Sequence, residues 1–126
     1  MGKTLKDVVE RSVQTISDCV AIDKIYLDRV TFGDIPLRDE LINLFLAQVA
    51  SMILKLPLLR RPDDWRFNAH SLRGAASAIG AQEIAALCTH WEEAGMPRLV
   101  ATRQNCVVLL QAAEIRFRDA LKTLRP

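Results

Sequence analysis

FNAHSLRGAASAIGAQEIAALCTHWEEAG, residues 67–95, predicts two helices folded back on each other. Gly80 suits the end of the first helix because glycine adopts a left-handed conformation without steric penalty. The second helix follows at once and stops at Gly95 and Pro97. Its apolar residues recur at helical spacing: Ile84, Leu87, Cys88 and Trp91. We therefore expect an antiparallel helical hairpin here.

His70 is predicted to lie on the solvent side of the first helix. At about 100° per residue, the opposite side is apolar and marks the core: Trp65, Ala69, Leu72, Ala76 and Ile79. The residues on the histidine's own side are basic, small or without a side chain: Arg66, Arg73, Gly74 and Ser77. Phe67 lies at the edge of that face. A buried histidine would have the reverse surroundings.

Glu92 is predicted to lie beside His70. The histidine is 10 residues before Gly80 and the glutamate 12 residues after it, so the two sit at similar heights on antiparallel helices. The carboxylate can accept a hydrogen bond from one imidazole nitrogen and leave the other nitrogen free to react. His90 lies off the apolar stripe and is expected to be solvated. We predict no metal site, since Cys88 and His90 would face different directions on a helix.

The preceding chain is also expected to be helical. Asp23 can cap a short helix through about Val30, with apolar contacts from Ile25, Tyr26 and Val30. Asp34 and Pro36 predict the start of a long helix that ends near Pro57. Its expected apolar stripe is Leu37, Leu41, Leu44, Phe45, Val49, Met52 and Leu56.

Two further patterns complete the predicted fold. Asp63 or Asp64 is expected to cap the helix that carries His70. Residues 98–125 contain no glycine or proline and predict a last helix with an apolar stripe: Leu99, Cys106, Leu110, Ala113, Phe117, Leu121 and Leu124. The expected fold is all-α, an up-down-up-down antiparallel four-helix bundle with an extra short N-terminal helix or helices. We assign residues 20–126 to the bundle and residues 1–19, with an imperfect amphipathic pattern, to an N-terminal extension.

Composition narrows the classes of function. The chain has 126 residues, enough for one domain with a substantial hydrophobic core. Its net charge is only +2 and its basic residues are scattered, which gives no indication of nucleic-acid binding. No uninterrupted apolar run approaches 18 residues and charged residues occupy the N-terminus, so we expect a cytoplasmic protein. Cys88 and Cys106 fall on apolar stripes and are expected to be core residues. The arginines of the last helix are expected to be solvated.

Together these features resemble the histidine phosphotransfer (HPt) family. Its usual pattern is H-x-L-K-G, a run of small residues, then G-A and a later L-C-x-x-(x)-E. The matching positions in this chain are His70, Leu72, Arg73, Gly74, Ala75, Ala76, Gly80, Ala81, Leu87, Cys88 and Glu92. Residues 21–45 are similar to the family's first short helix, Gly-Asp turn and first long helix, so the resemblance spans about residues 20–125. Arg73 departs from the commoner lysine.

The resemblance implies a phosphocarrier rather than an enzyme. His70 would accept a phosphoryl group from the aspartate of a receiver domain and pass it to another receiver, in a relay that begins at a hybrid sensor histidine kinase. Arg73 and Glu92 would stabilise the phosphoryl group or orient the ring. The residues expected to contact the partner are Phe67, Ser71, Gly74 and Ser77. The protein would act as a monomer without a cofactor of its own, since Mg²⁺ belongs to the receiver.

Two other classes of function are considered. A sensor kinase's dimerisation and phosphoacceptor domain also carries a histidine on a helix, but it needs an acidic residue directly after the histidine and an ATP-binding domain. Ser71 and the end of the sequence at Pro126 weigh against both features. A non-catalytic adaptor would bind a receiver or kinase without carrying phosphate. The intact His70 and Arg73 weigh against this alternative.

Overall fold

The computed structural model describes residues 20–124, and the regular secondary structure in this part of the chain is all helical, as predicted. The predictions for residues 1–19 lie outside the described residues. The helices are α2 (Lys24–Val30), α3 (Ile35–Lys55), the 3₁₀ turn η1 (Leu56–Leu58), α4 (Pro62–Ile79), α5 (Gln82–Ala94) and α6 (Val100–Leu121).

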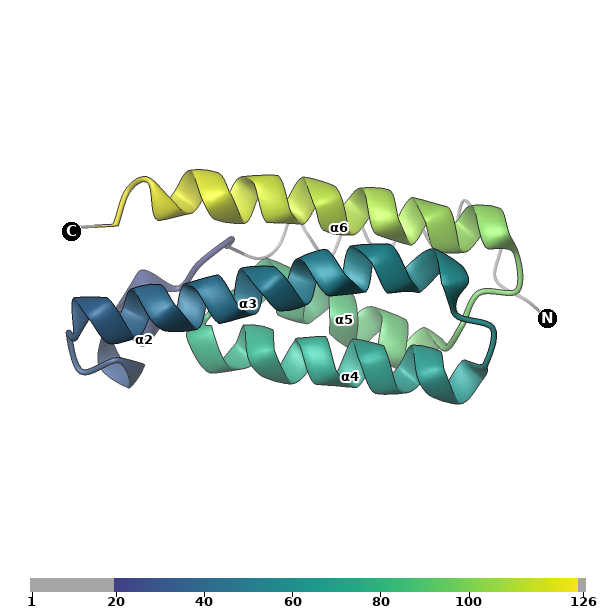
Figure 1. Cartoon of the computed structure of the whole chain (residues 1–126), viewed down its shortest axis with the longest axis horizontal. Helices are drawn as coiled ribbons and strands as arrows, with labels where there is room; N and C mark the ends of the chain where they lie inside the picture. The colour runs from purple at the N-terminus through teal and green to yellow at the C-terminus, as the bar shows by residue number, and fades with distance from the viewer. Residues whose placement is uncertain (1–19, 125–126) are drawn as a thin grey trace.

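The four long helices lie side by side with their axes roughly aligned (Figure 1). Helices α4 and α5 form the most extensive pair, as expected for a helical hairpin, and both α3 and α6 pack against this unit. Helix α3 contacts α4 and α6, and α5 also contacts α6, so α4 and α6 lie diagonally across the bundle. The short helix α2 packs against α4.

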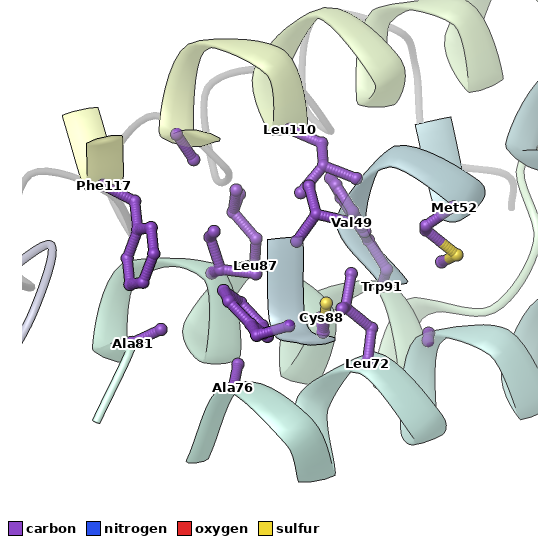
Figure 2. Packing of buried hydrophobic residues seen from close by; sticks show 14 of the residues in the cluster. Val49, Met52, Leu72, Ala76, Ala81, Leu87, Cys88, Trp91, Leu110 and Phe117 are labelled. Atoms are coloured by element: carbon purple, nitrogen blue, oxygen red, sulfur yellow. The ribbon is translucent and has the colours of Figure 1, made fainter. Parts of the chain in front are cut away.

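One apolar core joins the four long helices. Leu72 and Ala76 of α4 face Leu87 and Cys88 of α5, with Val49 of α3 and Leu110 of α6 nearby (Figure 2). The rings of Phe45 and Phe117 meet edge to face at 5.2 Å, and those of Trp65 and Trp91 lie 6.4 Å apart. Burial of each such large side chain contributes about 1.5–3 kcal/mol to folding, so these contacts hold the four helices together. The predictions that Trp91, Cys88 and Cys106 belong to the core are confirmed.

Two of the three predicted N-cap residues are confirmed. The carboxylates of Asp23 and Asp34 accept hydrogen bonds from the backbone N–H groups of Tyr26 and Leu37, each at 3.0 Å. The predicted cap of α4 by Asp63 or Asp64 is wrong. Both aspartates lie inside its first turn, because Pro62 begins the helix and holds the preceding residue in an extended conformation. There the carboxylates face the positive end of the helix dipole.

The predicted apolar stripe of α3 is confirmed at Phe45, Val49, Met52 and Leu56 and is wrong at Leu37 and Leu44. Its buried residues are Ile42, Phe45, Val49 and Met52, whereas Leu44 is 62% exposed and Leu37 is also exposed. The helix is apolar on more than one side, so the sequence did not define the edges of the buried stripe. Ile35–Leu58 is long and apolar enough to cross a membrane, a property shared by core helices of soluble proteins.

Other expected core contacts also differ. In α2, Leu27 is buried and Ile25 is exposed, because the cap at Asp23 sets which side of this short helix meets α4. Leu99 precedes α6 and is exposed, while Cys106, Leu110, Ala113 and Phe117 are buried as predicted. Among the arginines of α6, Arg103 is buried rather than solvated because its guanidinium donates to the backbone oxygens of Pro97 and Arg98.

Gly80 allows the reversal between α4 and α5. Its φ of +79° is in the left-handed region, as predicted, and the N–H of Ala81 donates to the Ala76 oxygen at 2.9 Å. A Cβ at this position would lie 3.0 Å from the Asp23 oxygen. The Asp23 N–H donates in turn to the Gly80 oxygen at 2.8 Å. Glycine therefore permits both the turn and the close approach of α2.

Candidate functional site

The outer face of α4 presents His70 to solvent. The histidine side chain is 61% exposed, while Leu72, Ala76 and Ile79 on the opposite side of the helix are buried. This arrangement follows the predicted helical periodicity, since residues half a turn apart face opposite directions. Burial of the apolar side fixes the rotation of α4 and thereby the outward direction of the imidazole.

Glu92 of α5 contacts both His70 and Arg73. Its Oε1 lies 2.8 Å from Nδ1 of the imidazole, and its Oε2 lies 3.2 Å from Nε of the guanidinium. Arg73 Nη2 also lies 3.0 Å from Nδ1 of His70. The hairpin thus brings together three side chains that the sequence analysis selected, each in contact with the other two.

The two contacts at Nδ1 of His70 cannot both be hydrogen bonds. A carboxylate only accepts, so Nδ1 must carry a proton to bond with Glu92, whereas Arg73 only donates and would need a lone pair there. An unprotonated Nδ1 would set its lone pair against a carboxylate oxygen at 2.8 Å, which is repulsive. We therefore assign the proton to Nδ1 and pair Arg73 with Glu92.

This tautomer leaves a lone pair on Nε2 of His70. Among the described residues, none forms a hydrogen bond with Nε2, and the ring edge faces outward. An exposed neutral imidazole nitrogen is a competent nucleophile, and the proton on the other nitrogen lets the ring spread the charge that develops during attack. The arrangement can therefore accept an electrophilic group at Nε2.

Cys88 lies beneath this polar group and stays out of its chemistry. Burial raises the pKa of the Cys88 thiol to about 12, and the nearby Glu92 carboxylate adds to the increase while Arg73 opposes it. Burial likewise raises the pKa of Cys106 to about 12. Both thiols are therefore protonated at neutral pH, the form that is not nucleophilic.

The other predicted site residues surround the imidazole on α4. Phe67 and Ser77 are exposed one turn before His70 and two turns after it, and Gly74 is exposed one turn after it. A Cβ built at Gly74 would meet no atom of the described residues within 4 Å, so the glycine leaves open space beside the ring. Ser71 is also exposed and accepts a hydrogen bond from Gln48 of α3 at 3.2 Å.

Gln48 is a neighbour of the site that the sequence analysis missed. It lies in a stretch of α3 without charged side chains, residues 41–54, and is half-buried beside Ser71. A glutamine in a stretch of mostly apolar residues was the available signal. The expectation that His90 is solvated is wrong: it is half-buried, because it borders the buried stripe of α5 on the side opposite Glu92. Within residues 20–124, there is no cluster of three or more potential metal ligands.

Comparison with known proteins identifies the family. A model of the Hpt domain family matches residues 40–125, a range that contains His70, Arg73 and Glu92. The chain belongs to the Hpt family. No curated protein and no solved structure gives a significant match. Hpt domains act in phosphorelay signalling as phosphocarrier modules rather than enzymes, and they generally interact with response regulator receiver domains and kinases.

Proposed function

We propose that this Hpt protein carries a phosphoryl group on Nε2 of His70 between the aspartates of receiver domains, in a relay that begins at a hybrid sensor kinase. The hydrogen bond of 2.8 Å between Nδ1 and Glu92 carries this proposal. It supports a ring held in one orientation, with the lone pair of Nε2 directed at solvent, where a partner can reach it.

In the proposed transfer, the Nε2 lone pair attacks the phosphorus atom of a receiver's phospho-aspartate. The N–P bond forms as the P–O bond to the aspartyl group breaks, and the aspartate leaves as a carboxylate. The ring then carries positive charge, which the Glu92 carboxylate stabilises through the Nδ1 proton. Attack by the aspartate of a second receiver reverses these steps and restores the neutral ring.

Arg73 is proposed to stabilise the phosphoryl group. Its guanidinium already lies 3.0 Å from the imidazole through Nη2, and Glu92 holds its Nε side. The remaining N–H groups can bond to phosphoryl oxygens in pairs, a geometry that the point charge of a lysine does not offer. The arginine would therefore bring positive charge to the transfer.

The remaining chemistry is assigned to the partner. In-line phosphoryl transfer needs positioning and charge stabilisation, and we assign the Mg²⁺ to the receiver's own aspartate site. The scaffold would be a single up-down-up-down four-helix bundle of residues 20–126 that acts as a monomer in the cytoplasm. Each chain carries the whole set of His70, Arg73 and Glu92, so one copy suffices for this role.

Replacement of His70 by glutamine tests the proposal. Receiver domains from the same organism are labelled on aspartate with ³²P acetyl phosphate and mixed with wild type or with His70→Gln. We expect label on the wild type and none on the variant, with unchanged helicity by circular dichroism. Retained label on the variant would refute the assignment. Wild-type protein that binds receivers without acquiring label would identify a non-catalytic adaptor.

A further inference from the structure

One end of the bundle combines exposed aliphatic side chains with exposed basic ones. The connection from α3 to α4 and the connection from α5 to α6 both lie at the end opposite α2 (Figure 1). Large apolar side chains that are more than half exposed gather there: Leu54, Leu58, Leu99 and Val100. The basic residues that accompany them are also exposed: Lys55, Arg60, Arg61 and Arg98. We refer to these eight residues as the basic end.

The two connections at the basic end are tied to the bundle. Leu56 of η1 is fully buried and η1 packs against α6, while Leu58, two residues later, is 76% exposed. In the other connection, the buried guanidinium of Arg103 donates to the backbone oxygens of Pro97 and Arg98. The exposed leucines therefore project from anchored segments, and they stay at the surface although the core lies close by.

Charge distinguishes the basic end from the rest of the molecule. Residues 54–61 and 95–104 contain five basic residues and no carboxylate, although the whole chain has a net charge of only +2. Among the described residues, none forms an ion pair with the four exposed cations. Asp63 and Asp64 follow in the first turn of α4, where the positive end of the helix dipole offsets part of their charge. The basic end therefore carries an excess of positive charge.

The opposite end of the bundle exposes apolar side chains without this excess. Ile25 and Phe32 are both exposed there. Residues 20–40 and 114–124, which form that end, contain seven carboxylates and six basic residues, so their charges nearly cancel. Apolar exposure alone does not distinguish the two ends, whereas the excess of cations does.

We propose that the basic end binds reversibly to the surface of a bilayer that contains anionic phospholipids, as a peripheral contact that does not span it. Each cation near such a surface strengthens binding about fivefold, and exposed aliphatic side chains can enter the boundary between headgroups and acyl chains. The basic end supplies both contributions. A nucleic acid would use the cations but gain little from projecting leucines, since bases stack on aromatic rings.

This orientation leaves the His70 site accessible. His70 lies eight residues after Pro62, about 12 Å along α4 from the basic end, and its side chain is exposed on the flank of the bundle. Peripheral contacts of this kind reach about 5–10 Å into the boundary between headgroups and acyl chains, so the histidine stays outside the apolar layer. The proposal gives the protein a location and does not depend on the proposed phosphotransfer.

Vesicle flotation with the full chain tests the proposal. Binding to vesicles of phosphatidylcholine alone is compared with binding to vesicles of phosphatidylcholine and phosphatidylglycerol in equal parts. We expect at least tenfold tighter binding to the anionic vesicles and a marked loss at high salt, because salt screens exposed charges. Equal affinity for both kinds of vesicle, or binding to neither, would overturn the proposal.

Two double charge reversals separate the basic end from the charge of the whole chain. Arg60→Glu with Arg98→Glu changes the basic end, and Lys24→Glu with Arg29→Glu changes the opposite end by the same net charge. We expect the affinity for anionic vesicles to fall tenfold or more in the first double variant and less than threefold in the second. Equal losses would contradict the proposal, because the attraction would then belong to the chain as a whole.

A matched pair of asparagine substitutions tests the apolar contribution. Leu58→Asn should weaken vesicle binding threefold or more, whereas Phe32→Asn, at an exposed residue of the opposite end, should keep wild-type affinity. Circular dichroism and thermal unfolding verify that every variant is folded. An unchanged affinity of Leu58→Asn, or duplex DNA bound more tightly than the anionic vesicles with the same dependence on Arg60 and Arg98, would overturn the assignment to a bilayer.

Discussion

Substitutions at Gly74 are expected to raise the stability of the protein, and a large side chain there is expected to slow phosphotransfer. This glycine lies inside α4 with ordinary helical geometry, and a Cβ there would meet no described atom within 4 Å. Glycine inside a helix costs about 0.8–1.0 kcal/mol relative to alanine. Gly74→Ala should therefore raise the free energy of unfolding by about 1 kcal/mol, and the melting temperature by roughly 3–5 °C for a chain of this size.

A larger side chain at the same position should slow transfer while it keeps the gain in stability. Helical side chains lean toward the N-terminus, so a leucine introduced by Gly74→Leu would extend toward His70, one turn earlier. We expect a rise in melting temperature close to that of Gly74→Ala and a tenfold or greater loss in the rate of transfer from a receiver. Thermal unfolding by circular dichroism and transfer from labelled receivers provide the two measurements.

Gly80→Ala serves as the matched control. At a φ of +79° alanine destabilises the folded state by about 1–2 kcal/mol relative to glycine, and its Cβ would lie 3.0 Å from the backbone oxygen of Asp23. We expect a loss of about 2 kcal/mol or more, with transfer per folded molecule retained. A lower melting temperature for Gly74→Ala, or wild-type transfer by Gly74→Leu, would refute the reasoning that this glycine is kept for access at the expense of stability.

Five other substitutions have defined outcomes. Glu92→Ala should slow transfer about threefold to tenfold through loss of one hydrogen bond to the ring. Glu92→Gln should be less affected because it keeps an acceptor oxygen. Wild-type transfer rates in both variants would show that Glu92 has no role in the site. Arg116→Met should cost about 2–4 kcal/mol in urea unfolding, since it leaves the buried Glu83 carboxylate without its partner at 2.6 Å. Glu83→Gln should cost less because Arg116 is partly solvated, and the reverse order would contradict this account. Phe32→Asn should stabilise the protein by about 0.5–1 kcal/mol, because the phenylalanine is 90% exposed at a φ of +55°; a lower unfolding midpoint would contradict it.

The hairpin was the most predictable part of the fold. Its apolar residues keep strict helical spacing on both helices, and a single glycine marks the reversal, so few alternatives exist for residues 67–95. The same spacing predicted that His70 faces solvent. The proximity of Glu92 followed from counting residues on either side of Gly80, and the observed contact of 2.8 Å agrees with that count.

The sequence did not predict which residues at the edges of the α3 stripe are buried. A helix with leucine, isoleucine or valine on several sides has no unique stripe, and the choice among them depends on what α4 and α6 present in three dimensions. For this reason Leu44 was assigned to the core although it is exposed, and Gln48 was not linked to Ser71. Contacts between residues distant in the chain, such as that between Gln48 and Ser71, leave no local signal in the sequence.

Because α4 and α5 are joined by the turn at Gly80, the number of residues between His70 and Glu92 determines whether the two side chains meet. His70 and Glu92 are 22 residues apart, and each lies about 15–18 Å from the turn along its helix. One residue added to or removed from either side would rotate the carboxylate about 100° around its axis and shift it by about 1.5 Å, away from the imidazole. Substitutions can alter the site one group at a time, whereas a change of length in this hairpin would separate the ring from its carboxylate with every functional side chain still present.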